Sequence, residues 1–344
     1  MTERQKLLES IANTTADYRE GELPAPTPEH VDRWVRQFQK EVQIELLREL
    51  DHVFKTTYLS KATVTSFLQR MVKSTKIAGD TPCDFWARAH FLNIQTNGYS
   101  QKEMLELVDR ILTKECKLSV EECGKAGGDY VYVDDVMFSG NRVGNDLATW
   151  VAKKAPPKGK VHIVVAAIHS SGEHLVGKRL KRVIADSGKA IALKYWRIAT
   201  VENRKYYKND SGVLWPTEVP VDAATQQYVA LPHKFPLELR KPGEKFEPFS
   251  SEQGRQLLER EFLVAGVKIR GLSQNPKDIL RPLGFSPFGV GFGSMTVTYR
   301  NCPNNCPLAL WWGDPEATSG PFHWYPLFQR KTYAQNIDFD GIDL

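Results

Sequence analysis

The sequence predicts an α/β fold class: a doubly wound, mostly parallel sheet with a helical N-terminal addition and an irregular C-terminal addition. Apolar residues recur at helical spacing through the first 80 residues. Short apolar runs then alternate with helical patterns up to residue 200, which is the order of β-α-β units. Beyond that point the pattern weakens and proline is frequent. We therefore expect a helical region over 1–80, an α/β core over 81–200, and a C-terminal elaboration over 201–344 packed on the core.

Composition and charge exclude several classes of protein. The 344 residues are 41% hydrophobic and 25% charged, as in an ordinary globular protein. No run approaches the roughly 20 apolar residues that a membrane helix needs, and the first residues lack the apolar segment of a signal peptide. We therefore expect a cytoplasmic protein with no membrane contact. The 46 basic and 41 acidic residues give a net charge of +5, which permits binding of phosphorylated ligands or nucleic acid without requiring it.

The five cysteines are few, odd in number and irregularly spaced. This pattern favours reduced thiols over a disulfide framework. Cys302 and Cys306 form a C-x3-C pair, and His323 follows further along the chain. A structural zinc ion needs four ligands and the chain offers no second pair of this kind, so we expect no zinc site.

The N-terminal helices are predicted from apolar spacing and from their first residues. Thr27 is a hydroxyl cap directly before Pro28, which is favoured at the first helical position. Apolar residues then recur on one face: Val31, Trp34, Val35 and Phe38. The same period continues over 44–54, and a further helix is expected to begin at Ser60.

Four candidate strands follow, with helical patterns between them, at 91–95, 130–133, 161–168 and 190–196. The third is an almost continuous apolar run, which is typical of a strand buried on both faces. Ser100 and Glu103 form an S-x-x-E capping box and predict that a helix begins there. Weaker patterns predict a helix over 251–265 and a strand over 295–299.

The most informative segment joins the second of these strands to the next helix. The strand ends in two acids, Asp134 and Asp135, which a doubly wound fold brings to the carboxyl edge of the sheet, where ligands bind. The loop that follows carries hydroxyl, glycine, amide and guanidinium groups: Ser139, Gly140, Asn141 and Arg142. Free N–H groups and the positive end of the helix dipole favour an anion at such a helix start. The acids suit ribose hydroxyls, or a magnesium ion between carboxylate and phosphate, so the segment predicts a ribose 5-phosphate group.

Two other interpretations of these residues stay open. An acid-rich strand end followed by a Ser-Gly helix cap has the same pattern without any ligand. Alternatively, Asp134 and Asp135 belong to a metal-dependent phosphohydrolase, a function that needs further acids at other strand ends. None is obvious, because Asp109 lies within a predicted helix and Asp186 at the end of another.

The segment resembles the phosphoribosyl pyrophosphate loop of type I phosphoribosyltransferases. In that family an apolar strand is followed by two acids, three variable residues and Thr/Ser-Gly-x-Thr/Ser. The resemblance implies the sheet of that family, with Asp134 and Asp135 on the ribose hydroxyls, residues 139–142 on the 5-phosphate, and Mg2+ as the cofactor. Arg142 stands where the family usually carries a second hydroxyl, which leaves open whether catalysis is retained.

Two further groups of residues are candidates for the same site. By the same resemblance the loop after the first strand holds pyrophosphate, and here that loop offers Asn97, Gly98, Ser100 and Lys102. A capped helix start after a glycine turn explains these residues equally well. After the third strand, His169 or Glu173 is placed to line the site and to move a proton. The alternative there is a polar turn in which Ser171 caps a helix over 172–187.

A wider resemblance covers roughly residues 28–332. It rests on the helix around Trp34 and Phe38, the Asp-Asp-x-x-x-Ser-Gly-Asn loop, and the segments 301–307 and 324–328. These are similar to phosphoribosyltransferase-like proteins of prokaryotic conflict systems, including those encoded beside retron reverse transcriptases. The resemblance implies an effector of antiviral, retron-type defence that binds phosphoribosyl pyrophosphate or a related nucleotide. It also implies a homodimer and control by a reverse transcriptase with its RNA–DNA product. The alternative is a catalytically degenerate module that senses a nucleotide or assembles with the reverse transcriptase complex.

Overall fold

A four-stranded parallel sheet forms the centre of the α/β part in the computed structural model, which describes residues 1–96, 98–243 and 245–331. Its strands lie side by side in chain order: β2 (His90–Phe91), β3 (Tyr130–Val133), β5 (Lys158–Val164) and β7 (Ala190–Trp196). All three pairings are parallel, which confirms the predicted fold class. β2 is shorter than the predicted strand because the N–H groups of Ile94 and Gln95 donate to the Gln101 side chain instead of a neighbouring strand.

Three short strands continue the long ones and form a second parallel sheet: β4 (Val136–Met137), β6 (Ala167–His169) and β8 (Ala199–Val201). Each begins after a short break, so the strand predicted over 161–168 is interrupted. Asp134 and Asp135 fill the first break. The Asp134 N–H donates to the Val164 carbonyl (3.0 Å), and the Asp135 carbonyl accepts from the Ala166 N–H (2.8 Å). β3 ends at Val133, as predicted, and the two acids lie in the break between two strand segments.

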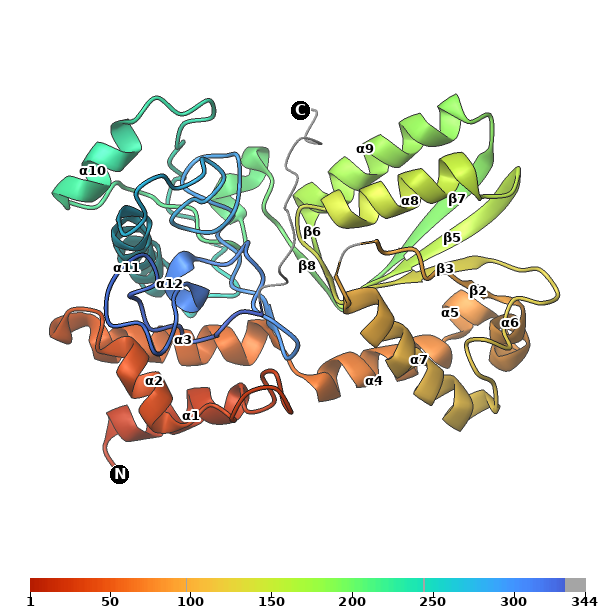
Figure 1. Cartoon of the computed structure of the whole chain (residues 1–344), viewed down its shortest axis with the longest axis horizontal. Helices are drawn as coiled ribbons and strands as arrows, with labels where there is room; N and C mark the ends of the chain where they lie inside the picture. Colours follow the sequence, from red (N-terminus) through yellow and green to blue (C-terminus); the bar gives the residue numbers. More distant parts are fainter. Residues whose placement is uncertain (97, 244, 332–344) are drawn as a thin grey trace.

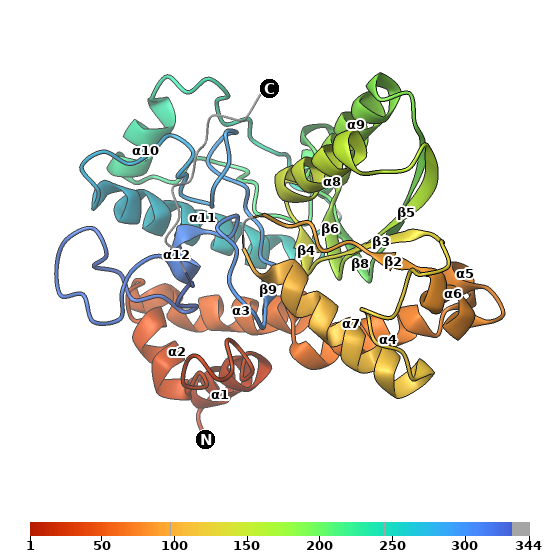
Figure 2. The ribbon, with the colours of Figure 1, turned by 45° about the vertical axis from the view of Figure 1, so that its right-hand side comes forward.

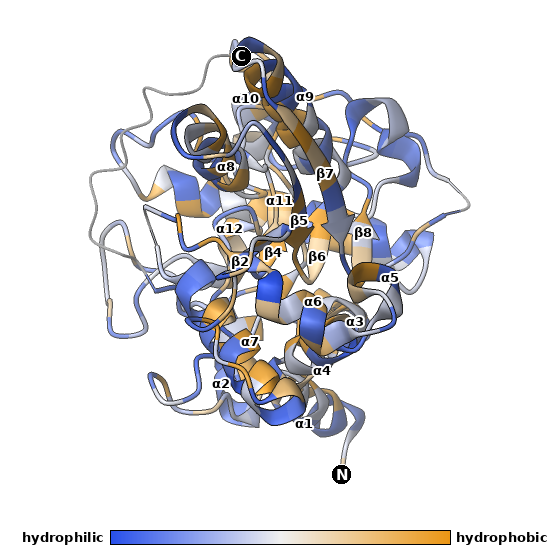
Figure 3. Cartoon of the chain, turned by 90° about the vertical axis from the view of Figure 1, so that its right-hand side faces the viewer, coloured by the Kyte–Doolittle hydropathy of each residue, from blue (hydrophilic) through white to orange (hydrophobic). Residues whose placement is uncertain are grey.

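Helices cover both faces of the sheets and produce three layers (Figures 1 and 2). On one face, α8 (Asn141–Lys153) and α9 (Ser170–Asp186) bury Tyr132 and Ile163. On the other face, Val131 and Val133 pack with α7 (Ser100–Cys116) and with the N-terminal helices. Successive side chains of a strand point to opposite faces, so both faces need apolar residues. β4 and β6 are accordingly coloured as hydrophobic segments in Figure 3.

The N-terminal region is helical, as its apolar spacing predicts. Its elements are α1 (Glu3–Thr14), α2 (Pro28–Val35), η1 (Lys40–Val42), α3 (Gln43–Thr57), α4 (Lys61–Val72), α5 (Thr75–Ala78) and α6 (Pro82–Arg88). Two predicted helix starts are confirmed. The Thr27 hydroxyl accepts from the His30 N–H (3.2 Å), and the Ser60 hydroxyl accepts from the Thr63 N–H (3.1 Å).

The C-terminal region packs against these helices. Its elements are η2 (Lys205–Asp210), α10 (Ala223–Ala230), α11 (Glu252–Gly271), β9 (Val297–Thr298) and α12 (Leu308–Trp311). β9 pairs in parallel with β1 (Tyr58–Leu59), and α11 lies beside α3 and α12 (Figure 2). The Trp34 indole N–H donates to the Ala309 carbonyl (2.8 Å). Segments far apart in the sequence therefore share one hydrophobic core.

One prediction about the cysteines is wrong. Cys83 on α6 and Cys116 at the end of α7 form a disulfide, with their Cα atoms 5.3 Å apart. They are 33 residues apart in the sequence, and only the packing of the two helices brings them together. Cys302 and Cys306 are buried free thiols.

Within residues 1–96, 98–243 and 245–331, no group of three or more His, Cys, Asp or Glu side chains is arranged to hold a metal ion. No helix in these ranges is long and apolar enough to cross a membrane.

Candidate active site

The predicted phosphate loop lies between β4 and α8. Gly140 precedes the helix with a φ of +75°, a conformation that favours glycine. A Cβ atom there would lie 2.6 Å from both the Gly172 carbonyl oxygen and Val176 Cγ2 on α9. The Asn141 N–H makes one long hydrogen bond, 3.4 Å, to the Ser139 hydroxyl. Otherwise no described side chain caps α8, so its dipole and first N–H groups are available to an anion.

Arg142 extends from the first turn of α8 and is exposed. Its guanidinium lies against Gly98, where a Cβ atom would come within 2.6 Å of Nη1. The structure therefore brings the predicted 5-phosphate loop beside one residue of the predicted pyrophosphate loop. Arg142 forms no ion pair with a residue that the structure describes, so its charge is available to a ligand. Lys102 is exposed on the first turn of α7, and Asn97 lies outside the described residues.

Asp134 is buried beside this loop, with 5% of its surface exposed. Its Oδ1 accepts from the Asp135 N–H (2.9 Å). Burial, and then the neighbouring charge of Asp135, raises the pKa of Asp134 to about 7. A hydrogen bond from the Ser100 hydroxyl and the charge of Arg142 act in the opposite direction. Near neutral pH the Asp134 carboxyl group is therefore partly ionised and partly protonated. The ionised form only accepts hydrogen bonds, whereas the protonated form can also donate one to a ligand hydroxyl.

We expect Asp134→Asn to change how the stability of the protein depends on pH. The pKa of Asp134 is higher in the folded state than its ordinary 3.8, so folded protein binds this proton more tightly. The contribution of Asp134 to wild-type stability should therefore fall as the pH rises from about 4 to about 7 and then level off. Between pH 4.5 and pH 8 the variant should gain about 2 to 3 kcal/mol relative to wild type. Urea unfolding at both pH values measures this, and an equal difference at the two values contradicts it.

Arg300 forms an ion pair with one of the two adjacent acids. We call these acids, Asp134 and Asp135, the acid pair. Arg300 Nη1 lies 2.8 Å from Asp135 Oδ2 and its Nε 2.5 Å from Glu103 Oε2, while its side chain is 7% exposed. Burial alone would lower the pKa of Arg300, but the charges of Asp135 and Glu103 raise it above its ordinary value. Arg300 was not among the predicted site residues, because 165 positions separate it from Asp135. Its only local signal is a cation shortly after the predicted strand over 295–299.

Two predicted helix caps are wrong. α7 begins at Ser100 itself, whose hydroxyl bonds Asp134 and the Gln95 side chain. Glu103 forms an ion pair with Arg300 instead of closing a capping box. α9 begins at Ser170, and the Ser171 N–H donates to the Asn203 side chain (2.9 Å). In both places a tertiary partner competes with the local hydrogen bond that the sequence pattern suggests.

The acid pair does not fit direct coordination of Mg2+. Asp135 Oδ1 accepts from the Val136 N–H (2.7 Å) and Oδ2 from Arg300, while Asp134 is buried and its Oδ1 is bonded to backbone. Proteins usually bind Mg2+ through one or two open carboxylates together with ligand phosphates. A Mg2+ ion at this site would depend on the oxygens of a bound ligand, and Mg2+ stays a prediction.

His169 and Glu173 both have partners within the protein. His169 is fully buried, with Nδ1 3.3 Å from the Met137 carbonyl oxygen and Nε2 3.1 Å from Ser294 Oγ. Burial lowers the pKa of His169 to about 4, so its imidazole is neutral at pH 7. Glu173 forms an ion pair with Arg197 at 2.9 Å. The His169 ring thus joins the end of β4, just before the predicted phosphate loop, to Ser294. Proton transfer by His169 or Glu173 stays a prediction.

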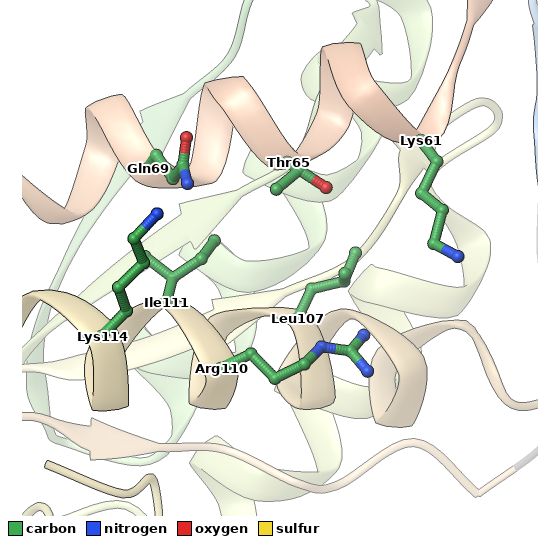
Figure 4. Close-up of a pocket in the computed structure, with 7 residues that line it drawn as sticks. All are labelled: Lys61, Thr65, Gln69, Leu107, Arg110, Ile111 and Lys114. Carbon is green, nitrogen blue, oxygen red and sulfur yellow. The ribbon is translucent and has the colours of Figure 1, made fainter.

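A separate groove of about 320 Å3 lies between α4 and α7 (Figure 4). Its walls are aliphatic and cationic, from Lys61, Thr65 and Gln69 on α4 and from Leu107, Arg110, Ile111 and Lys114 on α7. No predicted site residue lines it. The groove and the acid pair therefore use different parts of α7, whose first turn carries Ser100 and Glu103.

Comparison with known proteins gives one result. A family model, PRTase-CE, matches residues 31–330. Neither the curated proteins nor the solved structures gave a significant match. The matched range contains the acid pair, the phosphate loop and Arg300, together with most of the helices on either side. The chain belongs to the PRTase-CE family and is a phosphoribosyltransferase-like protein.

Proposed function

We propose that the chain binds phosphoribosyl pyrophosphate, or a related nucleotide, at residues 134–142 and acts as a phosphoribosyltransferase-like effector. One observation carries the proposal: the start of α8, the guanidinium of Arg142 and the buried carboxyl of Asp134 are neighbours. A phosphate group would bind at the N-terminus of α8, and the acid pair would receive the ribose hydroxyls. Membership of the family supports the same assignment.

The chemistry of transfer would draw on placement and charge. The bond between ribose C1 and pyrophosphate breaks, a bond from C1 to the acceptor forms, and positive charge develops at the sugar. A fixed carboxylate near the ribose would stabilise that charge, as preorganised charges do in other active sites. Arg142, packed against Gly98, would stabilise the negative charge of the leaving pyrophosphate.

A second candidate function is binding without turnover. The ion pair between Arg300 and Asp135 favours it, because one of the two carboxylates is already neutralised by the protein itself. Arg142 in place of the usual hydroxyl points the same way. Under this alternative the chain senses a nucleotide or assembles with a reverse transcriptase complex.

The wider biological role is also a proposal. We assign the chain to the cytoplasm and to antiviral, retron-type defence, with a reverse transcriptase and its RNA–DNA product as the partner that restrains it, and with a homodimer as its assembly. Support comes from the sequence resemblance over residues 28–332. Co-purification of the two proteins, before and after nuclease treatment, tests the partnership.

Calorimetric titration with phosphoribosyl pyrophosphate, with and without Mg2+, tests ligand binding. We expect Arg142→Gln to weaken binding at least about 10-fold, because a charge-assisted hydrogen bond to phosphate is lost. Lys153→Gln is a matched control, since it removes the same charge from the exposed far end of α8. Equal affinities for the two variants contradict the proposal.

Mass spectrometry separates the two candidate functions. The protein is incubated with phosphoribosyl pyrophosphate and a mixture of nucleotides, and the small molecules are analysed. Release of pyrophosphate or a ribosylated product supports transfer. Binding in the calorimeter with no product supports the sensing module.

A further inference from the structure

The C-terminal region contains a buried arginine with no acidic partner. Arg281 is 3% exposed, and its Nη1 contacts two groups, His233 Nδ1 at 2.7 Å and the Tyr228 hydroxyl at 3.4 Å. Its Nε is fully buried and has no acceptor among the residues that the structure describes. Nη2 lacks one as well but, unlike Nε, is not sealed from solvent. Arginine is rarely buried without a group that balances its charge.

Two other buried arginines of this region form ion pairs with buried or partly buried glutamates, which balance their charge. Arg240 and Arg255 are 2% and 0% exposed, and both pair with Glu259, at 3.0 Å and 2.9 Å. Glu252 adds a second ion pair to Arg240 at 2.7 Å. Across the described ranges, no carboxylate forms such a pair with Arg281. The charge of Arg281 is therefore suited to an anion supplied by a ligand.

The charged groups around Arg281 and His233 are mostly positive. Burial, and then the charge of Arg281, lowers the pKa of His233. Arg270, whose guanidinium lies 5.3 Å from the Tyr228 ring centre, acts in the same direction, and Asp278 acts against it. His233 is thus neutral at pH 7 and accepts from Arg281 through Nδ1. Two guanidinium groups and one carboxylate therefore act on the His233 ring.

An exposed aromatic ring, Phe288, lies on a loop that is hydrogen-bonded to the segment carrying His233. Phe288 is 49% exposed, and its ring centre lies 4.7 Å from that of Phe235. The Gly289 N–H donates to the Phe235 carbonyl (2.9 Å), which ties this loop to the segment that carries His233. Lys234 Nζ lies 5.4 Å from the Phe235 ring centre and adds another cation. Positive charge beside an exposed ring suits a phosphate joined to a flat base.

We propose that Arg281, His233 and Tyr228 form a second anion site, which takes the phosphate group of a nucleotide whose base lies against Phe288. The planar fork of Arg281 offers N–H donors in the geometry that phosphate oxygens accept. The site shares no residue with the loop over 134–142. It therefore stands whether or not that loop binds phosphoribosyl pyrophosphate.

NMR of the His233 ring tests this proposal, with inorganic phosphate and AMP as separate probes. The protein carries Arg142→Gln, so that the proposed site over residues 134–142 does not compete for the probes. Both probes should shift the His233 signals, and AMP should bind at least about 10-fold more tightly than phosphate, because only AMP has a base to stack. Both should also raise the pKa of His233, because a nearby anion stabilises the charged imidazolium. A purely structural role for Arg281 would produce neither effect.

Further variants separate the parts of the site. Arg281→Gln should abolish both responses, and Phe288→Ala should weaken AMP binding while leaving phosphate binding unchanged. Arg281→Lys keeps the charge and should retain a weakened response, which serves if the glutamine variant does not fold. The proposal is overturned if neither probe affects His233, or if the response is the same in Arg281→Gln. Equal affinity for phosphate and AMP would overturn the nucleotide assignment.

Discussion

Gly140→Ala should lower the stability of the protein by about 2 to 4 kcal/mol and weaken phosphate-ligand binding at least about 10-fold. Gly140 has a φ of +75°, where a side chain is strained, and a Cβ atom would lie 2.6 Å from the Gly172 carbonyl oxygen. Because that oxygen belongs to the backbone of α9, the loop itself would have to move. Movement of the loop displaces the start of α8, where the phosphate is expected to bind. Urea unfolding and calorimetric titration measure the two effects.

Gly144→Ala provides the matched control on the same helix. Gly144 lies within α8 and has no positive φ. A Cβ atom there would meet Arg179 Cδ at 3.4 Å, Arg179 Nη1 at 3.5 Å and Val176 Cγ2 at 3.7 Å, all ordinary contacts with side chains. Alanine is the better helix former, so this variant should be neutral or up to about 1 kcal/mol more stable, with unchanged binding. Similar losses at both glycines would show that the left-handed turn has no special role.

Arg300→Met should destabilise the protein by about 3 to 5 kcal/mol, the usual cost of breaking a buried ion pair from one side. The methionine fills much of the arginine volume but leaves the Asp135 carboxylate, 19% exposed, without its cation. Chemical unfolding followed by circular dichroism measures the size of the loss.

Glu103→Gln is the control for this prediction. Glu103 is 42% exposed, so its half of the bridge to Arg300 is largely in solvent and should contribute less than about 1 kcal/mol. Combining Arg300→Met with Asp135→Asn should restore part of the lost stability, since both charges are then absent. If the double variant is as unstable as the sum of the two single variants, the ion pair is not the source of the effect.

Much of the candidate site is predictable because its residues are neighbours in the sequence. Asp134, Asp135 and the loop up to Arg142 lie within nine consecutive positions, so a strand followed by a helix is enough to place them together. Arg300 and Gly172 come from other parts of the chain, and no local spacing reveals them. Arg300 forms an ion pair with Asp135, and the Gly172 carbonyl oxygen leaves no room for a side chain at position 140.

The helix starts show the same division. Thr27 caps a helix as predicted, and Ser60 caps the helix expected to begin there. Each hydroxyl accepts a hydrogen bond from a backbone N–H three residues ahead. Ser100 has the same local pattern, but its hydroxyl bonds Asp134 and the Gln95 side chain instead. The disulfide between Cys83 and Cys116 is a further case, in which helix packing rather than spacing determines the partner.

The sequence by itself determined the fold class and the position of the loop for which we propose phosphate binding, because side-chain periodicity and a strand-loop-helix pattern are local properties of the chain. Only the tertiary structure decided the electrostatic state of the site. Burial raises the pKa of Asp134 to about 7, and Arg300 neutralises Asp135, so two adjacent acids of equal appearance in the sequence behave differently. Both effects depend on which groups from distant segments exclude water or place charge within a few ångströms, and that is fixed only when the chain is folded.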